Sequence, residues 1–139
     1  MSAARPRPEV IPPGPWTQPL PQEHQLGNGL RLLVHDIPGQ QVVAARVVLP
    51  VSLADEPRDR EGVTVMVSRL LDEGAGGRGP EEFALALERC GAVLGSGVVD
   101  GGLSVDLDVP RRSLPTAMSL LRDAIVDPLF PEDEARRVL

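Results

Sequence analysis

The chain has 139 residues, which is enough for one modest domain. Its net charge of −6, spread along the sequence, disfavours a nucleic acid or an anionic membrane as the main partner. No apolar run is long enough to cross a membrane, and the first residues lack the apolar core of a secretory signal. A single cysteine, Cys90, excludes an internal disulfide, so we expect a cytoplasmic protein.

Residues 1–22 are rich in proline and contain the chain's one tryptophan, Trp16. Because proline fixes φ and lacks an amide donor, we expect this segment to be extended and largely unpaired. We interpret it as a flexible tail, or as an arm lying on another surface. A ligand for a proline-recognition domain is the alternative. The ordered domain is expected over residues 23–139.

The first part of this domain is predicted to form strands. Asn28-Gly29 is a strong turn signal, and apolar residues follow it at 30–34. Residues 41–51, QVVAARVVLPV, are rich in β-branched side chains and are typical of a buried strand. The short stretch IPGQQ between the two predicts that they pair as a hairpin.

Residues 61–74, EGVTVMVSRLLDEG, are predicted to form a helix. Asp59 is the expected N-cap, and Gly74 is the glycine expected just after the helix. The apolar side chains at helical spacing are predicted to share one face, and they are Val63, Met66, Val67 and Leu70.

A second helix is predicted to begin at Pro80, which suits a first helical position, and to end at Gly91. Its apolar stripe consists of Phe83, Leu87 and Cys90. At that spacing we interpret Cys90 as a packed small hydrophobe rather than as a nucleophile.

Asp100-Gly101-Gly102 predicts a hairpin between two further strands. The side chains from 103 to 109 alternate strictly, and the apolar set is Leu103, Val105, Leu107 and Val109. Asp106 and Asp108 lie on the opposite face, where we interpret them as solvated rather than as paired catalytic carboxylates.

Ser113 is the expected cap of a third helix, which Asp127-Pro128 ends. Its predicted inner face consists of Leu114, Ala117, Met118, Leu121 and Ile125. A fourth helix opens at Pro131 and stops at Leu139 after about two turns, so we expect a truncated domain.

This order of elements predicts an α+β fold, with a mostly antiparallel sheet and helices packed on one face. Four stretches, in the same order and spacing, are NGLRLLV, EGVTVMVSRLLDEG, LERCGAVL and DPLFPEDEARRVL. Through them the chain resembles the pitrilysin/insulinase family of zinc metallopeptidases, the inverted zincins. The resemblance covers about residues 25–139 and implies the N-terminal part of that family's first domain.

The family's catalytic motif, H-x-x-E-H, places two zinc-binding histidines and a base on one helical face. Aligning Gly62 and Gly74 with the family's glycines puts Val65, Ser68 and Arg69 at those three positions. Val65 offers no lone pair, Ser68 is a poor base, and Arg69 keeps a positive charge that repels a metal. The resemblance therefore implies a member that has lost its zinc motif.

The other candidate ligand residues do not replace the lost zinc motif. His24 and His35 lack a partner at ligand spacing, and we interpret them as loop or strand-end residues. By resemblance Glu134 falls at the position of an assisting acid, whereas its place in a first helical turn favours an ordinary surface acid. A pairing of Arg69 with Glu134 is our hypothesis for what replaces the charge of the metal. No cofactor is expected in this chain, and zinc only in an active partner.

The resemblance implies a pseudoenzyme, a non-catalytic subunit that forms a heterodimer with a zinc-competent homologue and helps to enclose a peptide substrate during proteolysis. Two alternatives stay open. One is a standalone scaffold or protein-binding module that uses the loop GAGGRGP and the proline-rich segment as contact surfaces. The other is a truncated fragment without activity of its own.

Overall fold

The computed structural model describes residues 10–51 and 53–138. The chain divides into two compact units, Met1–Gly39 and Gln40–Leu139. In the first unit, β1 (Gln22–Gln25) and β2 (Arg31–Val34) form an antiparallel hairpin.

The turn of this hairpin confirms the signal at Asn28-Gly29. Gly29 has a φ of 87°, a conformation that glycine adopts without steric cost. The Asn28 side chain accepts a hydrogen bond from the amide of Leu30 at 3.1 Å. This local turn pairs β2 with the strand before it.

The hairpin predicted between residues 30–34 and 41–51 would join the two units, and it stays a prediction. The strand β3 (Val42–Leu49) forms where residues 41–51 predict it, and it pairs with β5 (Gly102–Pro110). Pairing of β2 with β1 closes a loop of few residues, and short closures cost the least chain entropy.

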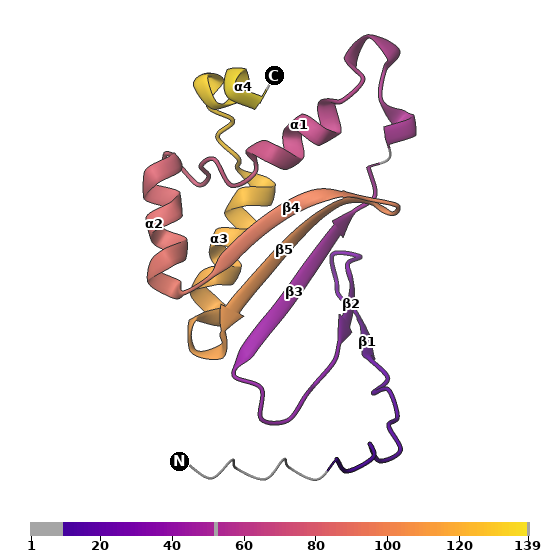
Figure 1. The fold of residues 1–139 in the computed structure, drawn as a ribbon. Helices are drawn as coiled ribbons and strands as arrows, with labels where there is room; N and C mark the ends of the chain where they lie inside the picture. Colours follow the sequence, from indigo (N-terminus) through magenta and orange to yellow (C-terminus); the bar gives the residue numbers. More distant parts are fainter. Residues whose placement is uncertain (1–9, 52, 139) are drawn as a thin grey trace, which may run out of the picture. The chain divides into compact units, whose positions relative to one another are not determined.

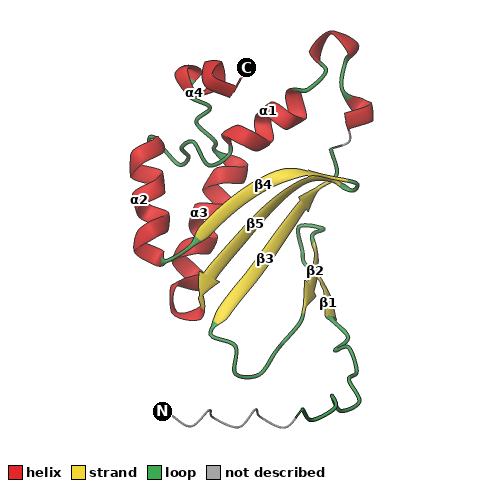
Figure 2. Ribbon diagram, viewed as in Figure 1, coloured by secondary structure: helices red, strands yellow, loops and turns green. Residues whose placement is uncertain are grey.

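The second unit contains a three-stranded antiparallel sheet in the order β3-β5-β4, with β4 at Val93–Val99. Three helices cover one face of this sheet, namely α1 (Val63–Leu70), α2 (Pro80–Cys90) and α3 (Leu114–Val126) (Figures 1 and 2). A further helix, α4 (Glu132–Val138), contacts α1. Three short 3₁₀ turns precede α1 and α3, at Leu53–Asp55, Arg58–Arg60 and Arg111–Ser113. This arrangement confirms the α+β fold class.

The core lies between the sheet and the helices. The largest fully buried side chains come from α2, α3 and β5, and they are Phe83, Leu121, Val105, Leu107 and Val109. Val105, Leu107 and Val109 are buried as the alternation predicts, and Ser104 is buried as well. Cys90 is buried in the same cluster, as a packed hydrophobe.

Helix α2 follows its sequence signals. Pro80 occupies its first turn, and Gly91 ends it in the left-handed conformation, at φ 64°. The amides of Gly91 and Ala92 donate to the carbonyls of Glu88 and Leu87, so the last turn of the helix is satisfied.

Helix α1 departs from prediction at both ends and on its face. Gly62 is its N-cap instead of Asp59. The helix ends at Leu70, so Gly74 lies beyond the cap, where its φ of 115° serves the following loop. Val63 is 42% exposed, whereas the polar Thr64 and Ser68 are buried. The spacing of apolar residues therefore predicts the wrong buried face for α1. Thr64 and Ser68 can be buried because both form hydrogen bonds within the fold.

Helix α3 shows a smaller difference. Met118, assigned to the inner face, is 42% exposed, and Leu120 and Ala124 are buried instead. No helix among the described residues is both long and apolar enough to cross a membrane.

Candidate functional site

Helix α1 carries the three positions that align with the zinc motif, and it contacts both β4 and α4. The Ser96 hydroxyl of β4 donates a short hydrogen bond to the main-chain carbonyl of Ser68. The Ser68 hydroxyl in turn donates to the carbonyl of Val65 at 2.7 Å. Ser68 therefore turns toward the sheet, and its hydroxyl is occupied within its own helix.

Val65 and Arg69 are both less buried than Ser68. Val65 is half-buried, and Arg69 is exposed. Val65 lines a shallow hollow of about 510 Å³ whose other lining residues are Arg60, Glu61, Gly62, Val63, Met66 and Val138. Apolar side chains supply most of this lining, and one of them, Val138, comes from α4, so the hollow offers mainly apolar contact.

The hypothesis that Arg69 pairs with Glu134 is wrong. Glu134 forms its ion pair with Arg137, one turn later on α4. Arg137 also reaches Glu73, with Nη2 3.3 Å from Oε1. No carboxylate in the described part of the chain lies within ion-pair distance of Arg69. The charges that join α4 to the end of α1 are those of Glu73, Glu134 and Arg137, which the motif alignment did not single out.

The start of α1 is held by a distant carboxylate. Glu56 accepts hydrogen bonds from the amides of Gly62 and Thr64, each at 2.7 Å. A hydrogen bond from the Thr64 side chain, together with these two amides, lowers the pKa of the Glu56 carboxyl. This contact takes over the role predicted for Asp59, and it fixes the first turn of the helix that carries the motif positions.

The residues at the motif positions do not fit zinc. An aliphatic group, an engaged hydroxyl and an exposed guanidinium provide no imidazole or carboxylate ligand. His24 and His35 are exposed and belong to the first unit, in β1 and just after β2. In residues 10–51 and 53–138, no three His, Cys, Asp or Glu side chains form a group suited to a metal ion.

Asp106 and Asp108 occupy the sheet face opposite the core. Asp106 forms an ion pair with Arg46 of β3 at 2.5 Å, and Asp108 is exposed. Both aspartates line a shallow hollow of about 410 Å³, together with Ala44, Ala45 and Arg46. Because Asp106 is paired with a cation rather than with Asp108, the two do not form a catalytic carboxylate pair.

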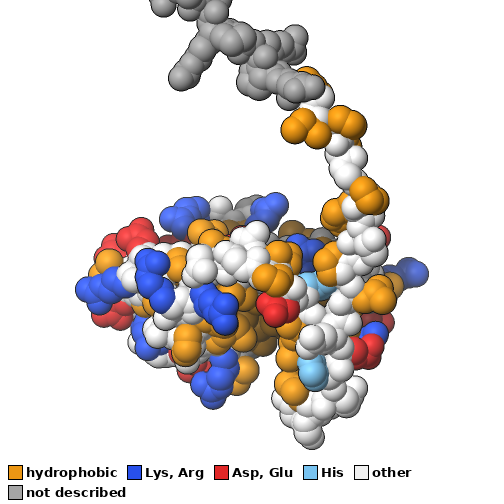
Figure 3. Space-filling view, turned by 90° about the horizontal axis from the view of Figure 1, so that it is seen from below, with side chains coloured by type: hydrophobic (Ala, Val, Ile, Leu, Met, Phe, Trp, Pro, Cys, Tyr) orange, Lys and Arg blue, Asp and Glu red, His pale blue; other side chains and the backbone are white. Residues whose placement is uncertain are grey.

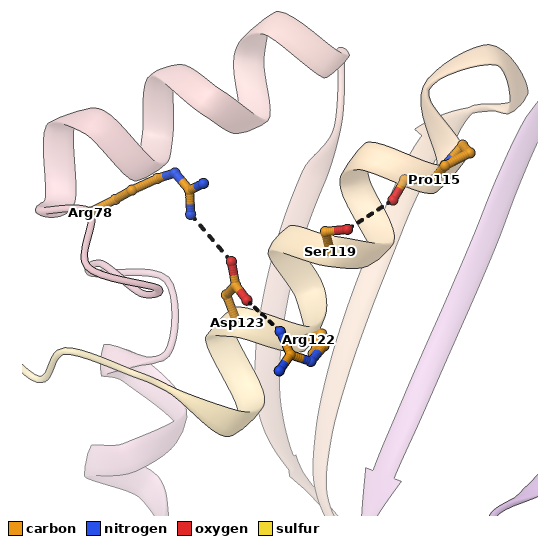
Figure 4. A network of polar contacts seen from close by, with 5 residues as sticks. All are labelled: Arg78, Pro115, Ser119, Arg122 and Asp123. Atoms are coloured by element: carbon orange, nitrogen blue, oxygen red, sulfur yellow. Dashed lines mark hydrogen bonds and ion pairs between the residues drawn. The ribbon is translucent and has the colours of Figure 1, made fainter.

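The loop at residues 74–79 packs against the end of α3. Ala75 is completely buried, and the Gly76 amide donates to the Asp127 carbonyl at 3.0 Å. Arg78 from this loop forms an ion pair with Asp123 of α3, at 3.2 Å (Figure 4). The loop is thus mostly an internal connection, in contrast to the contact surface that a scaffold would present.

Neither a family model nor a curated protein matches the sequence. Among solved structures, the fold matches the M16 peptidase inactive domain of Pseudomonas fluorescens, with a TM-score of 0.77 and 20% identity over 85% of this chain. A protease from Helicobacter pylori matches with a TM-score of 0.73 and 19% identity over 87%. Pitrilysin matches with a TM-score of 0.69 and 25% identity over 84%.

The chain spans less than a third of each of these proteins, at 29%, 30% and 13% of their lengths. The matches nevertheless cover 84% to 87% of this chain. The resemblance read from the sequence is thereby confirmed, and the chain has the fold of the pitrilysin family of M16 peptidases.

Proposed function

We propose that the chain belongs to a non-catalytic, peptidase-like subunit that supports an active zinc metallopeptidase partner in peptide processing, in the cytoplasm. The proposal rests on the side chains that α1 carries at the three positions aligned with the zinc motif. Val65 faces an apolar hollow, Ser68 is turned toward β4, and Arg69 extends into solvent. In a family that splits water on a zinc ion, this helix supplies none of the three required groups.

The fold supports a structural role beside a partner. One of the matched structures is itself described as an inactive M16 domain. We infer that this chain likewise contributes surface rather than chemistry, and that it helps to close a shared chamber around a peptide. The zinc ion and the catalytic base then belong to the partner, a homologue with an intact H-x-x-E-H motif.

The metal part of the proposal is tested by titrating the chain with Zn²⁺ in a calorimeter. We expect no stoichiometric binding. A single site tighter than about 1 µM would contradict the proposal.

The partner part is tested by co-expressing the chain with a homologue that carries H-x-x-E-H. We expect a complex of defined mass by light scattering, and faster hydrolysis of a quenched fluorescent peptide than with the homologue alone. Arg69→Glu should reduce this acceleration because Arg69 is exposed on the motif helix. Arg122→Glu, which changes another exposed arginine, on α3, is the matched control and should not reduce the acceleration. Co-elution with an unrelated protein, or no complex at all, would contradict the partnership.

A further inference from the structure

Residues 10–21 form an arm without helix or strand, and its apolar side chains are almost fully exposed. The exposed fraction is 78% for Trp16 and 88% for Leu20. Hydrophobic side chains recur along the arm in Figure 3, and the segment contains no charged residue. A neutral, apolar segment of this length that leaves its tryptophan in water is typical of an interaction site.

The sequence of the arm restricts its backbone to the extended polyproline II conformation. Prolines at positions 12, 13, 15, 19 and 21 have φ fixed near the required value. The residues before prolines, among them Ile11, Gln18 and Leu20, are kept out of the helical region by the following ring. Little conformational entropy is left for the arm to lose on binding, which favours docking.

Polyproline II has three residues per turn, so every third side chain lies on the same edge. One edge is entirely apolar and consists of Val10, Pro13, Trp16 and Pro19. A second edge carries a polar group among its prolines and consists of Pro12, Pro15, Gln18 and Pro21. The apolar edge is the one suited to insertion into a groove, and we call it the Trp16 edge.

We propose that residues 10–21 are a docking arm whose Trp16 edge binds an aromatic-lined groove on a separate folded domain. Grooves of this kind recognise preformed polyproline II segments through stacked aromatic rings. The chain cannot provide such a groove for itself or for a second copy. It has no tyrosine and two phenylalanines, of which Phe83 is completely buried and Phe130 is 39% exposed. The proposal is independent of the function proposed for α1.

The single tryptophan makes the arm directly observable. The full chain is labelled with 5-fluorotryptophan, so that its ¹⁹F spectrum reports on Trp16 alone. Purified SH3 and WW domains serve as probes because both bind proline-rich segments in aromatic grooves. We expect the resonance to shift on saturation with at least one domain, with weak dependence on salt because the arm is uncharged.

Two double variants distinguish binding through the Trp16 edge from an effect of the overall stiffness of the arm. Pro13→Ala with Pro19→Ala removes two prolines from the Trp16 edge and should weaken binding by about tenfold. Pro12→Ala with Pro15→Ala removes two prolines from the other edge and should weaken it by less than about threefold. Circular dichroism checks that both variants keep the fold of residues 40–138.

Three outcomes overturn the proposal. If the resonance shifts with neither domain, the arm does not recognise an aromatic groove. If it shifts when the chain alone is concentrated, the arm binds a second copy. If the two double variants lose the same affinity, binding depends on the stiffness of the arm and not on the Trp16 edge.

Discussion

The carboxylate of Glu56 accepts a hydrogen bond from the backbone amide of Thr64, at 2.7 Å, across eight positions of the chain. With the Gly62 amide it satisfies two donors at the start of α1 that have no partner within the helix. The cap thus comes from the preceding loop, and it ties that loop to the helix that carries the motif positions.

The Glu56 cap predicts an acid-sensitive contribution to stability. Its pKa is lowered in the folded chain, chiefly by the hydrogen bond from the Thr64 side chain. The stabilisation is therefore fully present above the ordinary pKa of a glutamate and is lost as the pH falls through the lower folded-state value. Glu56→Ala should lower Tm at neutral pH, and the difference from the parent should shrink in acid. Thermal unfolding followed over this pH range measures both.

Glu61→Ala is the matched control, because Glu61 is an exposed carboxylate beside the same helix start. It should leave Tm nearly unchanged at every pH. A Tm difference for Glu56→Ala that stays constant from neutral to acid pH would show that the carboxylate charge does not stabilise α1.

The elements that sequence patterns predict well are those set by local rules. Helix α2 begins at Pro80 and ends at Gly91 because proline and glycine favour those two backbone positions. The burial of Leu103, Val105, Leu107 and Val109 in β5 follows from their alternation, since a strand presents successive side chains to opposite faces. Ser104 is buried as well, which alternation alone does not predict. The turn at Asn28-Gly29 is likewise set by a local rule.

The candidate site is set by long-range contacts, which local patterns do not encode. Thr64 and Ser68 are buried because Glu56 and Ser96 reach them from elsewhere in the chain. The motif alignment did not show that Arg69 would lack a carboxylate partner among the described residues. That outcome depends on how α4 packs on α1 and on the choice of Arg137 as the partner of Glu134.

Gly102, at the start of β5, is predicted to tolerate no side chain. Its φ is 129°, and a Cβ atom there would lie 2.1 Å from the carbonyl oxygen of Leu49 in β3. Because the obstructing atom is backbone, Gly102→Ala should destabilise the domain by roughly 2–4 kcal/mol. Urea unfolding of the variant and of the parent gives the difference.

Gly101→Ala is the control for the same turn. The nearest atom to its Cβ is Val48 Cγ1 at 3.6 Å, an ordinary contact, so the change in stability should stay below about 1 kcal/mol. Equal losses for the two glycines would mean that the turn as a whole, rather than the contact with Leu49, limits substitution.

Asp123 is predicted to contribute more to stability than its exposed partner Arg122. Its side chain is 18% exposed, and its two oxygens lie 3.2 Å from Arg78 and from Arg122. Asp123→Ala should cost roughly 1–2 kcal/mol, because it leaves the Arg78 guanidinium unpaired against the packed loop at 74–79. Arg122→Ala should cost less than about 0.5 kcal/mol, since Arg122 is 72% exposed. Denaturant unfolding compares them, and a larger loss for Arg122→Ala would contradict this ranking.

A histidine pair restored on α1 tests whether the helix still presents the face that metal binding needs. Val65 and Arg69 are four positions apart on α1, so Val65→His with Arg69→His places two imidazoles on one helical face. We expect this double variant to bind Zn²⁺ by calorimetry. Val65→His with Met66→His is the matched control, because adjacent positions point apart, and it should bind at least about tenfold more weakly. Equal affinities would show that the spacing on α1 no longer matches that of a zinc-binding helix.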